Sequence, residues 1–556
     1  MAMSSDDVPP APAGMGRLDA AELAELAQYG DEQPLQAGEV LFRAGGTAYD
    51  LYLVIEGEVE IVRPDRDGED RIVVLGPGAP VGELGLITGA RPYLTARVTH
   101  PGRALRIKRE DLHRLTAGSP DIWDRLFETM AARRTRLVEG KGALAIRLVG
   151  SRYSPEALAI RAFLTRTNMP HTWIDVDADL DGDVLLASFG LRQEDVPSVL
   201  TAAGVLRRCT PGEVAAHLGL AYEPIPGLLF DLVVVGTGPA GLAAAVYGAS
   251  EGLETVSIDS IAIGGQAGAS SRIENYVGFP TGVSGGELAS RAAMQALRLG
   301  ARLNAPCAAA GLRVEHGYHV VTLADGSEIP ARAVLIATGA QYRRLPLPDL
   351  DRFEGAGVYY AATELEARMC LGRNAVVVGG GNSAGQAALH LAKGCAEVAI
   401  AIRGTDLHTS MSHYLVERIA AHRKIEILTE TEVRALGGDG HLEEVTLEHN
   451  PTRRRTTQPC GGLFCFIGAD PATGWLDGSV LLDDHGFILT DRDLPESTSE
   501  TRGFAGRQPL PYETSAPGVF AVGDVRHGSL KRVASAVGEG SSAVRSVHDH
   551  LATAGG

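Results

Sequence analysis

A glycine-rich turn in the second half of the chain has the residue types that bind a nucleotide phosphate. The apolar run DLVVV leads into Gly236-Thr237-Gly238-Pro239-Ala240-Gly241, a helical stretch follows, and Asp259 ends the next apolar run. Glycine lets the backbone turn sharply and approach a pyrophosphate, whose charge faces the helix N-terminus, while an acid can hold a ribose hydroxyl. Because strand, turn, helix and acid occur in the required order, we predict a dinucleotide site here.

A second turn of the same kind occurs further along the chain. The apolar run AVVV precedes Gly379-Gly380-Gly381-Asn382-Ser383-Ala384, and the strand after the next helix ends at Arg403 instead of at an acid. A cation at that strand end suits the extra 2′-phosphate of NADP. Asp406 stands close by in the sequence and offsets part of this charge, so NADH remains an alternative to NADPH.

Motifs around the first turn make residues 229–553 resemble the thioredoxin reductase family. Loops that look like the family's FAD-contacting loops are Gly264-Gly265-Gln266, residues 273–280, Ala337-Thr338-Gly339 and Val522-Gly523-Asp524-Val525. The resemblance implies FAD held without a covalent bond in a two-part domain, and it implies a homodimer. Further residues that it assigns to FAD are Gly265, Gln266, Asn275, Gly523, Asp524, Arg532 and Ala534. Val533 stands between the last two, where the family usually has glutamine.

The resemblance also describes the second turn. The family has two arginines and a third basic residue after the strand, and the corresponding residues here are Arg403, Gly404 and His408. One permanent charge therefore remains for the 2′-phosphate, which weakens the preference for NADPH over NADH.

The reactive segment of the family reads Tyr-Cys-Ala-Thr-Cys-Asp, and the corresponding segment here is Tyr360-Ala361-Ala362-Thr363-Glu364-Leu365. Without sulfur beside the flavin, direct reduction of thioredoxin by the family's route is excluded. Glu364 replaces a cysteine and is the candidate catalytic residue, as a proton donor. The alternative is a surface glutamate at the start of a helix. Disulfide reduction through Cys370 or the pair Cys460 and Cys465 also remains an alternative.

Residues 143–222 resemble a glutaredoxin or thioredoxin fold that has lost its redox pair. Ser151 and Ser154 stand at the strand-to-helix turn where that fold carries Cys-x-x-Cys, and Val196-Pro197 matches its cis-proline. Serine hydroxyls cannot replace thiols in redox exchange, so we expect this module to serve for docking or spacing.

Short alternating segments in residues 17–140 predict a small antiparallel β-roll that resembles the cyclic-nucleotide-binding domain. The start of the phosphate cassette corresponds to Gly82, Glu83 and Leu84. In that family a glutamate like Glu83 takes the ribose hydroxyl and an arginine nine positions later neutralises the phosphate, but that position here is Pro92. Arg91 or Arg97 can serve only if the loop takes another path. Cyclic nucleotide binding therefore stays open.

The overall composition excludes several classes of partner. Acidic residues outnumber basic ones 69 to 51, and the net charge of -18 opposes binding to nucleic acid or an anionic bilayer. The chain has no basic start followed by an apolar stretch, and no apolar run approaches the roughly 18–20 residues that span a bilayer, so we expect a cytoplasmic protein. The six cysteines form no zinc-like cluster, and no metal is expected.

The sequence therefore predicts a multidomain protein. We expect a flexible tail at 1–16, the N-terminal antiparallel β-roll at 17–140, a thioredoxin-like α/β module at 143–222, and two Rossmann-like α/β domains. The FAD-binding domain takes residues 229–345 and 471–553, and the NADPH-binding domain takes 346–470.

Three functional hypotheses follow. The first is a flavoprotein oxidoreductase that takes a hydride from NADPH to FAD and on to a small-molecule or protein acceptor. The second is a redox or cyclic-nucleotide sensor with little turnover. The third is a disulfide reductase that uses cysteines outside the family's motif.

Overall fold

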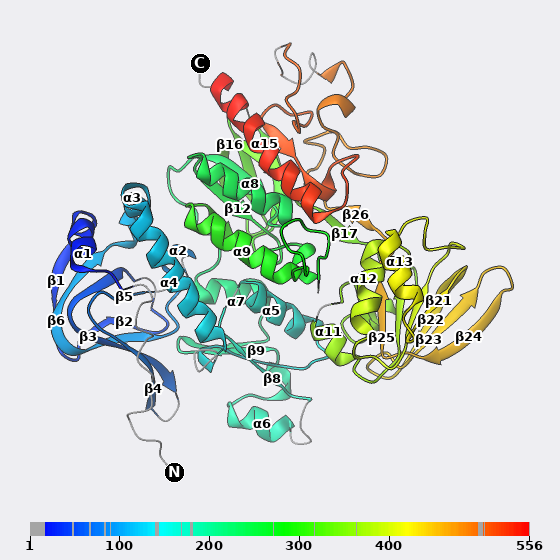
Figure 1. The fold of residues 1–556 in the computed structure, drawn as a ribbon, viewed down its shortest axis with the longest axis horizontal. Coiled ribbons are helices and arrows are strands. Elements are labelled where there is room, and N and C mark those ends of the chain that lie inside the picture. Colours follow the sequence, from blue (N-terminus) through cyan, green and yellow to red (C-terminus); the bar gives the residue numbers. More distant parts are fainter. Residues whose placement is uncertain are drawn as a thin grey trace.

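The computed structural model describes residues 17–554, apart from 47–48, 66–67, 83–84, 89, 140–143, 168, 178–181, 271, 316, 363, 499–503 and 505. The predicted tail at 1–16 lies outside the described residues, as do Glu83 and Leu84 of the predicted nucleotide cassette and the side chain of Glu364. The described chain forms four units, and its colours run from blue to red along the sequence in Figure 1.

The N-terminal unit is the predicted antiparallel β-roll. Its sheet has the order β1-β6-β3-β4, with β2 paired to β6 and β5 paired to β3. The strands are β1 (Asp31–Leu35), β2 (Val40–Phe42), β3 (Leu51–Asp65), β4 (Gly68–Leu75), β5 (Pro80–Val81) and β6 (Thr95–Ile107). The helices are α1 (Ala20–Leu26), α2 (Gly85–Thr88), α3 (Leu112–Gly118) and α4 (Pro120–Glu139). The expected closing helix is therefore present as α4.

The second unit, which we call the central module, has a four-stranded sheet of order β10-β9-β7-β8. Its elements are β7 (Arg147–Gly150), α5 (Pro155–Arg166), β8 (Thr172–Asp175), α6 (Gly182–Ser188), β9 (Ser198–Thr201), β10 (Gly204–Arg207) and α7 (Pro211–Leu218). Strands β7 and β8 are parallel, and the other pairs are antiparallel. The peptide bond between Val196 and Pro197 is cis, as predicted.

The third unit, the first Rossmann unit, is assembled from two separate parts of the chain. Its sheet has the order β13-β12-β11-β16-β15-β14, and β27 from the C-terminal part pairs in parallel with β16 (Figure 1). The strands are β11 (Phe230–Val235), β12 (Thr255–Ile258), β13 (Arg302–Asn304), β14 (Ala309–Val314), β15 (His319–Leu323), β16 (Glu328–Ile336) and β27 (Val519–Ala521). The helices are α8 (Pro239–Ser250), α9 (Gly285–Arg298) and α15 (Val533–Ala554).

The fourth unit, the second Rossmann unit, has a parallel sheet of order β18-β25-β19-β20-β21. The strands are β18 (Val358–Tyr359), β19 (Ala375–Val378), β20 (Val398–Ala401), β21 (Ile425–Leu428) and β25 (Gly462–Cys465). The helices are α10 (Leu350–Phe353), α11 (Glu364–Met369), α12 (Asn382–Leu391) and α13 (His413–Ala420). A smaller antiparallel sheet consists of β22 (Thr431–Gly437), β23 (Glu444–His449) and β24 (Arg454–Pro459).

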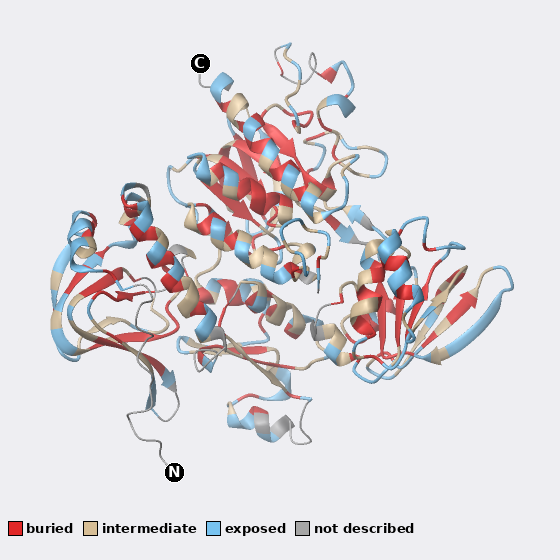
Figure 2. Cartoon of the chain, in the orientation of Figure 1, coloured by how far each residue is buried: buried red, intermediate tan, exposed pale blue. Residues whose placement is uncertain are grey.

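A two-stranded ribbon marks the entry to and exit from this unit. It pairs β17 (Ala340–Tyr342) with β26 (Ala469–Pro471). The strands of both Rossmann sheets are mostly buried (Figure 2), in keeping with the apolar runs that helices cover on both faces of a parallel sheet.

The β-roll shares a hydrophobic core with the first Rossmann unit. Buried residues of α4, including Trp123 and Phe127, pack in one cluster with Ala296 and Leu297 of α9. The Trp123 Nε1–H donates to the carbonyl oxygen of Arg298 at 3.2 Å, and the Arg298 guanidinium pairs with Asp124 at 2.6 Å. These two units therefore form one continuous packed body.

The described residues lack both a membrane-spanning helix and a metal-binding cluster. No helix there is both long and apolar enough to cross a bilayer. The same part of the chain also contains no group of three or more His, Cys, Asp or Glu side chains arranged to hold a metal ion.

Candidate dinucleotide sites

A cavity of about 190 Å³ opens where four parallel strands of the first Rossmann unit end. Its lining follows directly on β11, β12, β16 and β27, which is where open α/β sheets bind their ligands. The predicted FAD residues in the lining are Gly238, Pro239, Ala240, Asp259, Gly265, Gln266, Ala337, Thr338, Gly339, Gly523, Asp524, Arg532 and Val533. The structure thus gathers most of the predicted set, from both parts of the unit, around one space.

Four predicted residues do not line this cavity. Gly236 and Gly241 are buried beneath the turn, whereas Asn275 and Ala534 are exposed outside the lining. Lys531 lines the cavity and was missed by the sequence reasoning, although its place beside Arg532 was a usable signal. Its charge adds to the positive side of a site expected to hold a pyrophosphate.

The glycines of the first turn have the roles that phosphate binding requires. Gly236 has φ +110°, and a Cβ there would lie 2.2 Å from the carbonyl oxygen of Ala337. A Cβ at Gly241 would lie 1.8 Å from the carbonyl oxygen of Gly236, so only glycine lets α8 pack so closely. At Gly238 the nearest atom to an added Cβ, Cα of Gly265, is 4.0 Å away. That position faces open cavity, so the residues present fit a pyrophosphate.

Asp259 holds the first turn in place. Its Oδ2 accepts hydrogen bonds from the Thr237 backbone N–H at 2.8 Å and the Thr237 hydroxyl at 2.9 Å, and its Oδ1 accepts from the Ile261 N–H at 3.0 Å. The carboxylate therefore ties the glycine turn to the loop after β12. The sequence suggested the ribose contact, and this additional anchoring role appears only in the folded chain.

The C-terminal part closes the cavity through a buried ion pair. Glu539 on α15 accepts from the Gly523 N–H at 2.7 Å and pairs with Arg526 at 2.8 Å. Burial raises the pKa of the neighbouring Asp524, and the charge of Lys531 opposes this shift. The ion pair thus fixes the backbone beside a carboxyl group that solvent reaches poorly.

The second glycine turn repeats the architecture of the first. Gly379 has φ +132°, and a Cβ there would lie 2.2 Å from the carbonyl oxygen of Phe466. Gly381 caps α12, and the Asn382 side chain accepts from the Ser412 N–H at 2.7 Å. Ser383, the second residue of α12, lines the cavity of the first Rossmann unit. The two turns therefore open toward the same space.

An ion pair crosses between the two Rossmann units beside this space. Arg418 on α13 pairs with Glu274 at 2.7 Å, in the loop that also carries Asn275. This contact joins the units in the orientation that brings Ser383 to the cavity.

Arg403 lies exposed just beyond the end of β20, as a residue for a 2′-phosphate should. Asp406, which the sequence suggested as a partial counter-charge to Arg403, pairs instead with His408 at 2.7 Å, and this contact lowers the pKa of Asp406. The carboxylate is therefore committed to the histidine, and the expected offset of the Arg403 charge is reduced.

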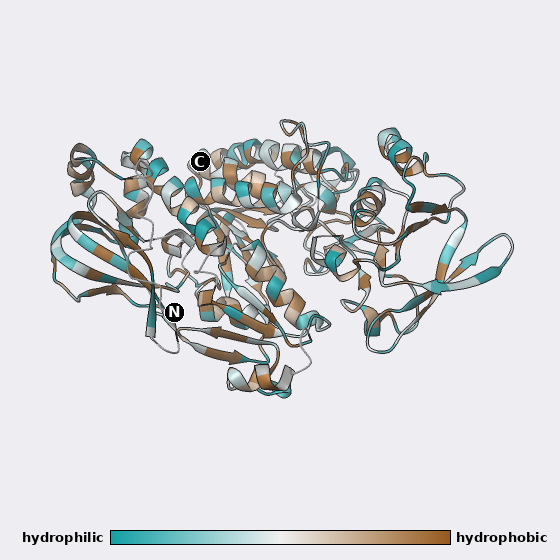
Figure 3. Ribbon diagram, turned by 60° about the horizontal axis from the view of Figure 1, so that its bottom comes forward, coloured by the Kyte–Doolittle hydropathy of each residue, from teal (hydrophilic) through white to brown (hydrophobic). Residues whose placement is uncertain are grey.

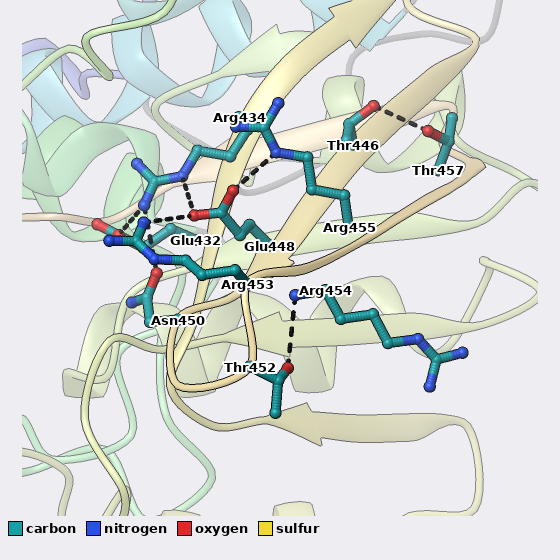
Figure 4. A network of polar contacts seen from close by, with 10 residues as sticks. All are labelled: Glu432, Arg434, Thr446, Glu448, Asn450, Thr452, Arg453, Arg454, Arg455 and Thr457. Carbon is teal, nitrogen blue, oxygen red and sulfur yellow. Dashed lines mark hydrogen bonds and ion pairs between the residues drawn. The ribbon is translucent and has the colours of Figure 1, made fainter.

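A cluster of arginines borders the same loop (Figure 4). Glu448 pairs with Arg455 at 2.7 Å, with Arg453 at 3.0 Å and with Arg434 at 3.3 Å. Hydrogen bonds from Arg455 and Arg453 lower the pKa of Glu448 to about 2. The sheet that carries the cluster is joined to the loop after β20, because the Glu430 N–H donates to the Gly404 carbonyl at 3.0 Å. Figure 3 shows its outer hairpin as strongly hydrophilic.

The segment that replaces the family's cysteines lies at the edge of the second Rossmann unit. Ala361 is half-buried and Ala362 is buried, while the Tyr360 hydroxyl donates to Glu354 at 2.5 Å. Glu364 is the first residue of α11, and its side chain lies outside the described residues. Its predicted role as proton donor is therefore untested by the geometry.

The cysteines of the third hypothesis are inaccessible. Cys370 and Cys465 are 0% exposed and Cys460 is 1% exposed, and none of the three forms a disulfide. Burial raises the pKa of Cys370 and Cys465 to about 12 and that of Cys460 to about 11. A buried thiol with so high a pKa is a poor nucleophile at neutral pH.

The structure describes both arginines suggested for the N-terminal cassette. Arg97 pairs with the buried Glu60 at 2.6 Å. Arg91 lies against the central module, where its backbone N–H donates to the carbonyl oxygen of Leu218 at 2.8 Å. Gly82 has φ +152°, in line with a glycine turn, and a phosphate contact from Arg91 stays a prediction, because Glu83 and Leu84 of the cassette lie outside the described residues.

Comparison with known proteins matches two family models. Residues 230–540 match the pyridine nucleotide-disulphide oxidoreductase model, and residues 32–119 match the cyclic nucleotide-binding domain model. The chain is 32% identical over 313 residues to thioredoxin reductase of Mycolicibacterium smegmatis, covering 56% of this chain and 94% of that protein. It is 30% identical over 324 residues to thioredoxin reductase of Treponema pallidum, covering 58% of this chain and 98% of that protein.

Solved structures agree with this assignment. The chain superposes on Lactococcus lactis thioredoxin reductase in the FR conformation with a TM-score of 0.52 and 28% identity, over 58% of this chain and 99% of the other. Thioredoxin reductase of T. acidophilum gives a TM-score of 0.52 and 28% identity, over 58% of this chain and 98% of the other. With its two glycine turns, its two-part first Rossmann unit and a family match over more than half its length, this chain belongs to the pyridine nucleotide-disulphide oxidoreductase family.

Proposed function

We propose that this chain is an FAD-dependent oxidoreductase that takes a hydride from NADPH to FAD and passes the electrons to an acceptor without a Cys-x-x-Cys disulfide. The first Rossmann unit, residues 229–345 and 471–553, holds FAD, and the second, residues 346–470, holds NADPH. One observation carries the proposal. Ser383 of the second glycine turn lines the cavity of the first turn, so the two cofactor sites share one space.

The residues of the first cavity have distinct tasks in this proposal. Gly238 and Gly265 leave room for the pyrophosphate, and the N-terminus of α8 faces its charge. Arg532 and Lys531 add positive charge, while Asp259 and Asp524 offer acceptors to hydroxyl groups. FAD, when bound, supplies the ability to accept a hydride and release electrons singly or in pairs.

NADPH is the preferred hydride source because of the charges around the second turn. Arg403 is exposed at the strand end, and Asp406 is engaged with His408. On the neighbouring sheet, Arg434, Arg453 and Arg455 pair with two glutamates, Glu448 and Glu432, so these five side chains carry one net positive charge in a chain whose net charge is -18. Such surroundings favour a ligand with an additional phosphate over NADH.

The electron acceptor is a small molecule or a protein that reaches the flavin directly. The burial of Cys370, Cys460 and Cys465 argues against a thiol relay. Glu364, where the family has its second cysteine, is our candidate for the group that protonates the acceptor.

The central module is a thioredoxin-like domain without redox chemistry. Its order of elements, βαβαββα, with β7 in the interior of the sheet, supports this assignment. The two serines at the redox positions have structural tasks, because the Ser151 hydroxyl donates to Asp177 at 2.5 Å and Ser154 caps α5.

A homodimer is also part of the proposal. An apolar hollow of about 300 Å³ lies beside α8 and α9, with Tyr247, Tyr276 and Phe279 in its lining. Tyr247 is 46% exposed in the single chain, so a second copy of the chain would remove apolar surface from water. Light scattering is expected to report twice the mass of one chain.

A second candidate function, a sensor of redox state or cyclic nucleotide, is favoured by the shared core between α4 and α9. A ligand of the β-roll could act on the cofactor cavity through this rigid contact, because packed cores transmit small shifts. The sensor would show slow turnover and a partner whose affinity depends on flavin redox state.

An anaerobic experiment separates these functions. NADPH, and separately NADH, is added to the purified flavoprotein, and the loss of flavin absorbance is followed before acceptors are admitted. We expect fast bleaching with NADPH and slower bleaching with NADH. Absence of bleaching with either nucleotide would contradict the enzyme proposal, and bleaching that depends on cyclic AMP would favour regulation by the β-roll.

A further inference from the structure

The central module contacts the second Rossmann unit with the very turn that carries Ser151 and Ser154. The Tyr153 ring in this turn stacks on His441, with ring centroids 5.8 Å apart and an interplanar angle of 28°. Pro155 packs against Gly355, where a Cβ would lie 3.5 Å from the proline ring. The turn at the start of α5 is therefore a contact surface.

In the second Rossmann unit, the residues that contact this turn lie beside residues 360–365, the segment that replaces the family's cysteines. Gly355 and Tyr359 precede that segment and α11 follows its start. Burial raises the pKa of Tyr359, and Tyr153 is among the groups that contribute. Arg161 of α5 interacts electrostatically with residues of α11, and Figure 1 places these two helices side by side. Two replaced redox motifs thus meet at one interface.

This pairing has a chemical meaning. A thiolate attacks a disulfide only at contact distance. Two domains that exchange disulfides must therefore bring their cysteine-containing segments into contact. Here the turn that carries Ser151 and Ser154 contacts the second Rossmann unit through Tyr153 and Pro155, and neither this turn nor residues 360–365 carry sulfur. The two segments thus border one interface that has no disulfide exchange to carry out. A transient exchange partner has to leave, whereas a contact with no reaction to complete can be permanent.

The central module also packs against the β-roll. Tyr93 and Leu94 of the β-roll pack into the core of the module with Phe163 and Leu164 of α5. The Arg91 N–H donates to the Leu218 carbonyl at the end of α7. Since the β-roll also shares a core with α9, the module is fixed relative to the first Rossmann unit.

The second Rossmann unit is therefore tethered at two separate places. Arg418 joins it to Glu274 of the first Rossmann unit, and His441 and Gly355 join it to the central module. A rotation of this unit that carried Ser383 away from the cavity would break both contacts at once.

We infer that the turn 151–155 of the central module is a permanent docking surface for the second Rossmann unit of the same chain, and that it locks this unit in the orientation that presents its nucleotide to the flavin cavity. The inference rests on the proposed function, and it specifies how that site is kept assembled. Without cysteines to reduce, the chain has no need to swing the unit away.

Cross-linking tests directly whether the turn 151–155 stays docked on the second Rossmann unit. The double variant Tyr153→Cys/His441→Cys, with FAD bound, is treated with a short bismaleimide and analysed by mass spectrometry. The native cysteines are buried, so the single variant Tyr153→Cys serves as the control without a link. We expect rapid linking with and without NADPH, and the linked protein is expected to bleach with NADPH at least as fast as the unlinked variant. Linked protein that no longer bleaches would overturn the inference, because it would show that turnover needs the unit to move.

Loosening the contact gives a complementary test. Tyr153→Ala removes a ring that is 41% exposed, and Tyr318→Ala, which removes a ring that is 42% exposed in the first Rossmann unit, is the matched control. Tyr153→Ala is expected to speed hydrogen exchange of residues 355–362 and to slow bleaching about fivefold, since a stacked ring pair contributes about 1 kcal/mol. The affinity for NADPH should not change. Equal exchange rates in wild type, variant and control would overturn the inference.

These readouts distinguish the lock from the proposed function. If wild-type protein never bleaches with NADPH or NADH, the enzyme proposal fails, yet linking yield and hydrogen exchange still report whether the docking exists. If wild-type protein bleaches but the linking fails, the enzyme proposal stands and the inference of permanent docking is wrong.

Discussion

The two glycine turns and the two replaced redox turns differ in what remains of their chemistry. At both Gly236 and Gly379 a Cβ would lie 2.2 Å from a carbonyl oxygen that follows the adjacent strand, so both phosphate turns keep the backbone that binding needs. The turns with Ser151 and Ala361 keep their place in the fold but lack sulfur. Phosphate binding depends on main-chain N–H groups and open space, whereas disulfide exchange depends on two side chains. The residues present fit the first kind of chemistry, and the turns with Ser151 and Ala361 carry no sulfur for the second.

The largest effect is expected when a valine side chain is placed in both glycine turns. Gly238 and Gly381 have φ of -67° and -88°, and neither has another atom closer than 4.0 Å to an added Cβ. Valine should therefore fold there but occupy the phosphate space. We expect Gly238→Val to lower FAD affinity about 100-fold, for roughly two lost charge-assisted hydrogen bonds, and to give colourless protein. Gly381→Val should stay yellow but require much more NADPH for bleaching, and a yellow Gly238→Val would contradict the site.

The next effect concerns the cation of the second turn. Arg403→Ala should lower kcat/KM for NADPH about tenfold, the worth of one charge-assisted hydrogen bond, and leave the value for NADH unchanged. Arg423→Ala, which removes another exposed arginine of the same unit, is the control. An equal loss of kcat/KM with both nucleotides would mean that Arg403 does not contact the 2′-phosphate.

A pH-dependent effect is expected for the arginine cluster beside that turn. The pKa of Glu448 is lowered from 4.5 to about 2 in the folded protein, so its contribution to stability is complete above pH 4.5 and is lost as pH falls toward 2. Glu448→Gln should therefore lower the unfolding temperature at neutral pH, and the difference from wild type should shrink across that acid range. Glu426→Gln, at an exposed position on β21, is the control. A constant difference would show that the charge of Glu448 is not what stabilises the sheet.

A smaller effect is expected from the ion pair between the Rossmann units. Arg418→Ala breaks the 2.7 Å contact with Glu274 and should slow bleaching about twofold, because a partly exposed ion pair contributes about 0.5 kcal/mol. Arg545→Ala, whose partner Asp549 is on the same helix, is the control and should have no effect. High salt should slow wild-type bleaching and so reduce the difference in bleaching rate between wild type and Arg418→Ala.

No effect on turnover is expected when the buried thiols are removed together. The variant Cys370→Ala/Cys460→Ala/Cys465→Ala should transfer electrons at the wild-type rate per bound flavin, since these thiols are buried and their pKa values are raised. Circular dichroism is needed to confirm that the variant is folded, because smaller side chains leave cavities. A folded variant without turnover would restore the disulfide hypothesis.

The sequence predicted the local parts of the sites well, because local spacing governs them. The order of strand, glycine turn and helix placed Gly238 and Gly381 correctly at the N-termini of α8 and α12. Pairings between distant or competing side chains were not predictable. Asp406 could pair with Arg403 or His408, and only the folded loop shows that it takes His408. The commitment of Arg97 to Glu60 likewise depends on the register of β3 against β6.

By itself, the sequence determined which residue types stand in the two glycine turns and in the two turns that lack cysteine. Glycines between a strand and a helix predict a phosphate turn, and a segment without cysteine supplies no thiol for disulfide exchange. Only the tertiary structure decided which of these parts meet. Ser383 reaches the first cavity, and Tyr153 reaches His441, because four units pack in one arrangement. Contacts between residues so far apart in the chain depend on the packing of whole units, which no local pattern records.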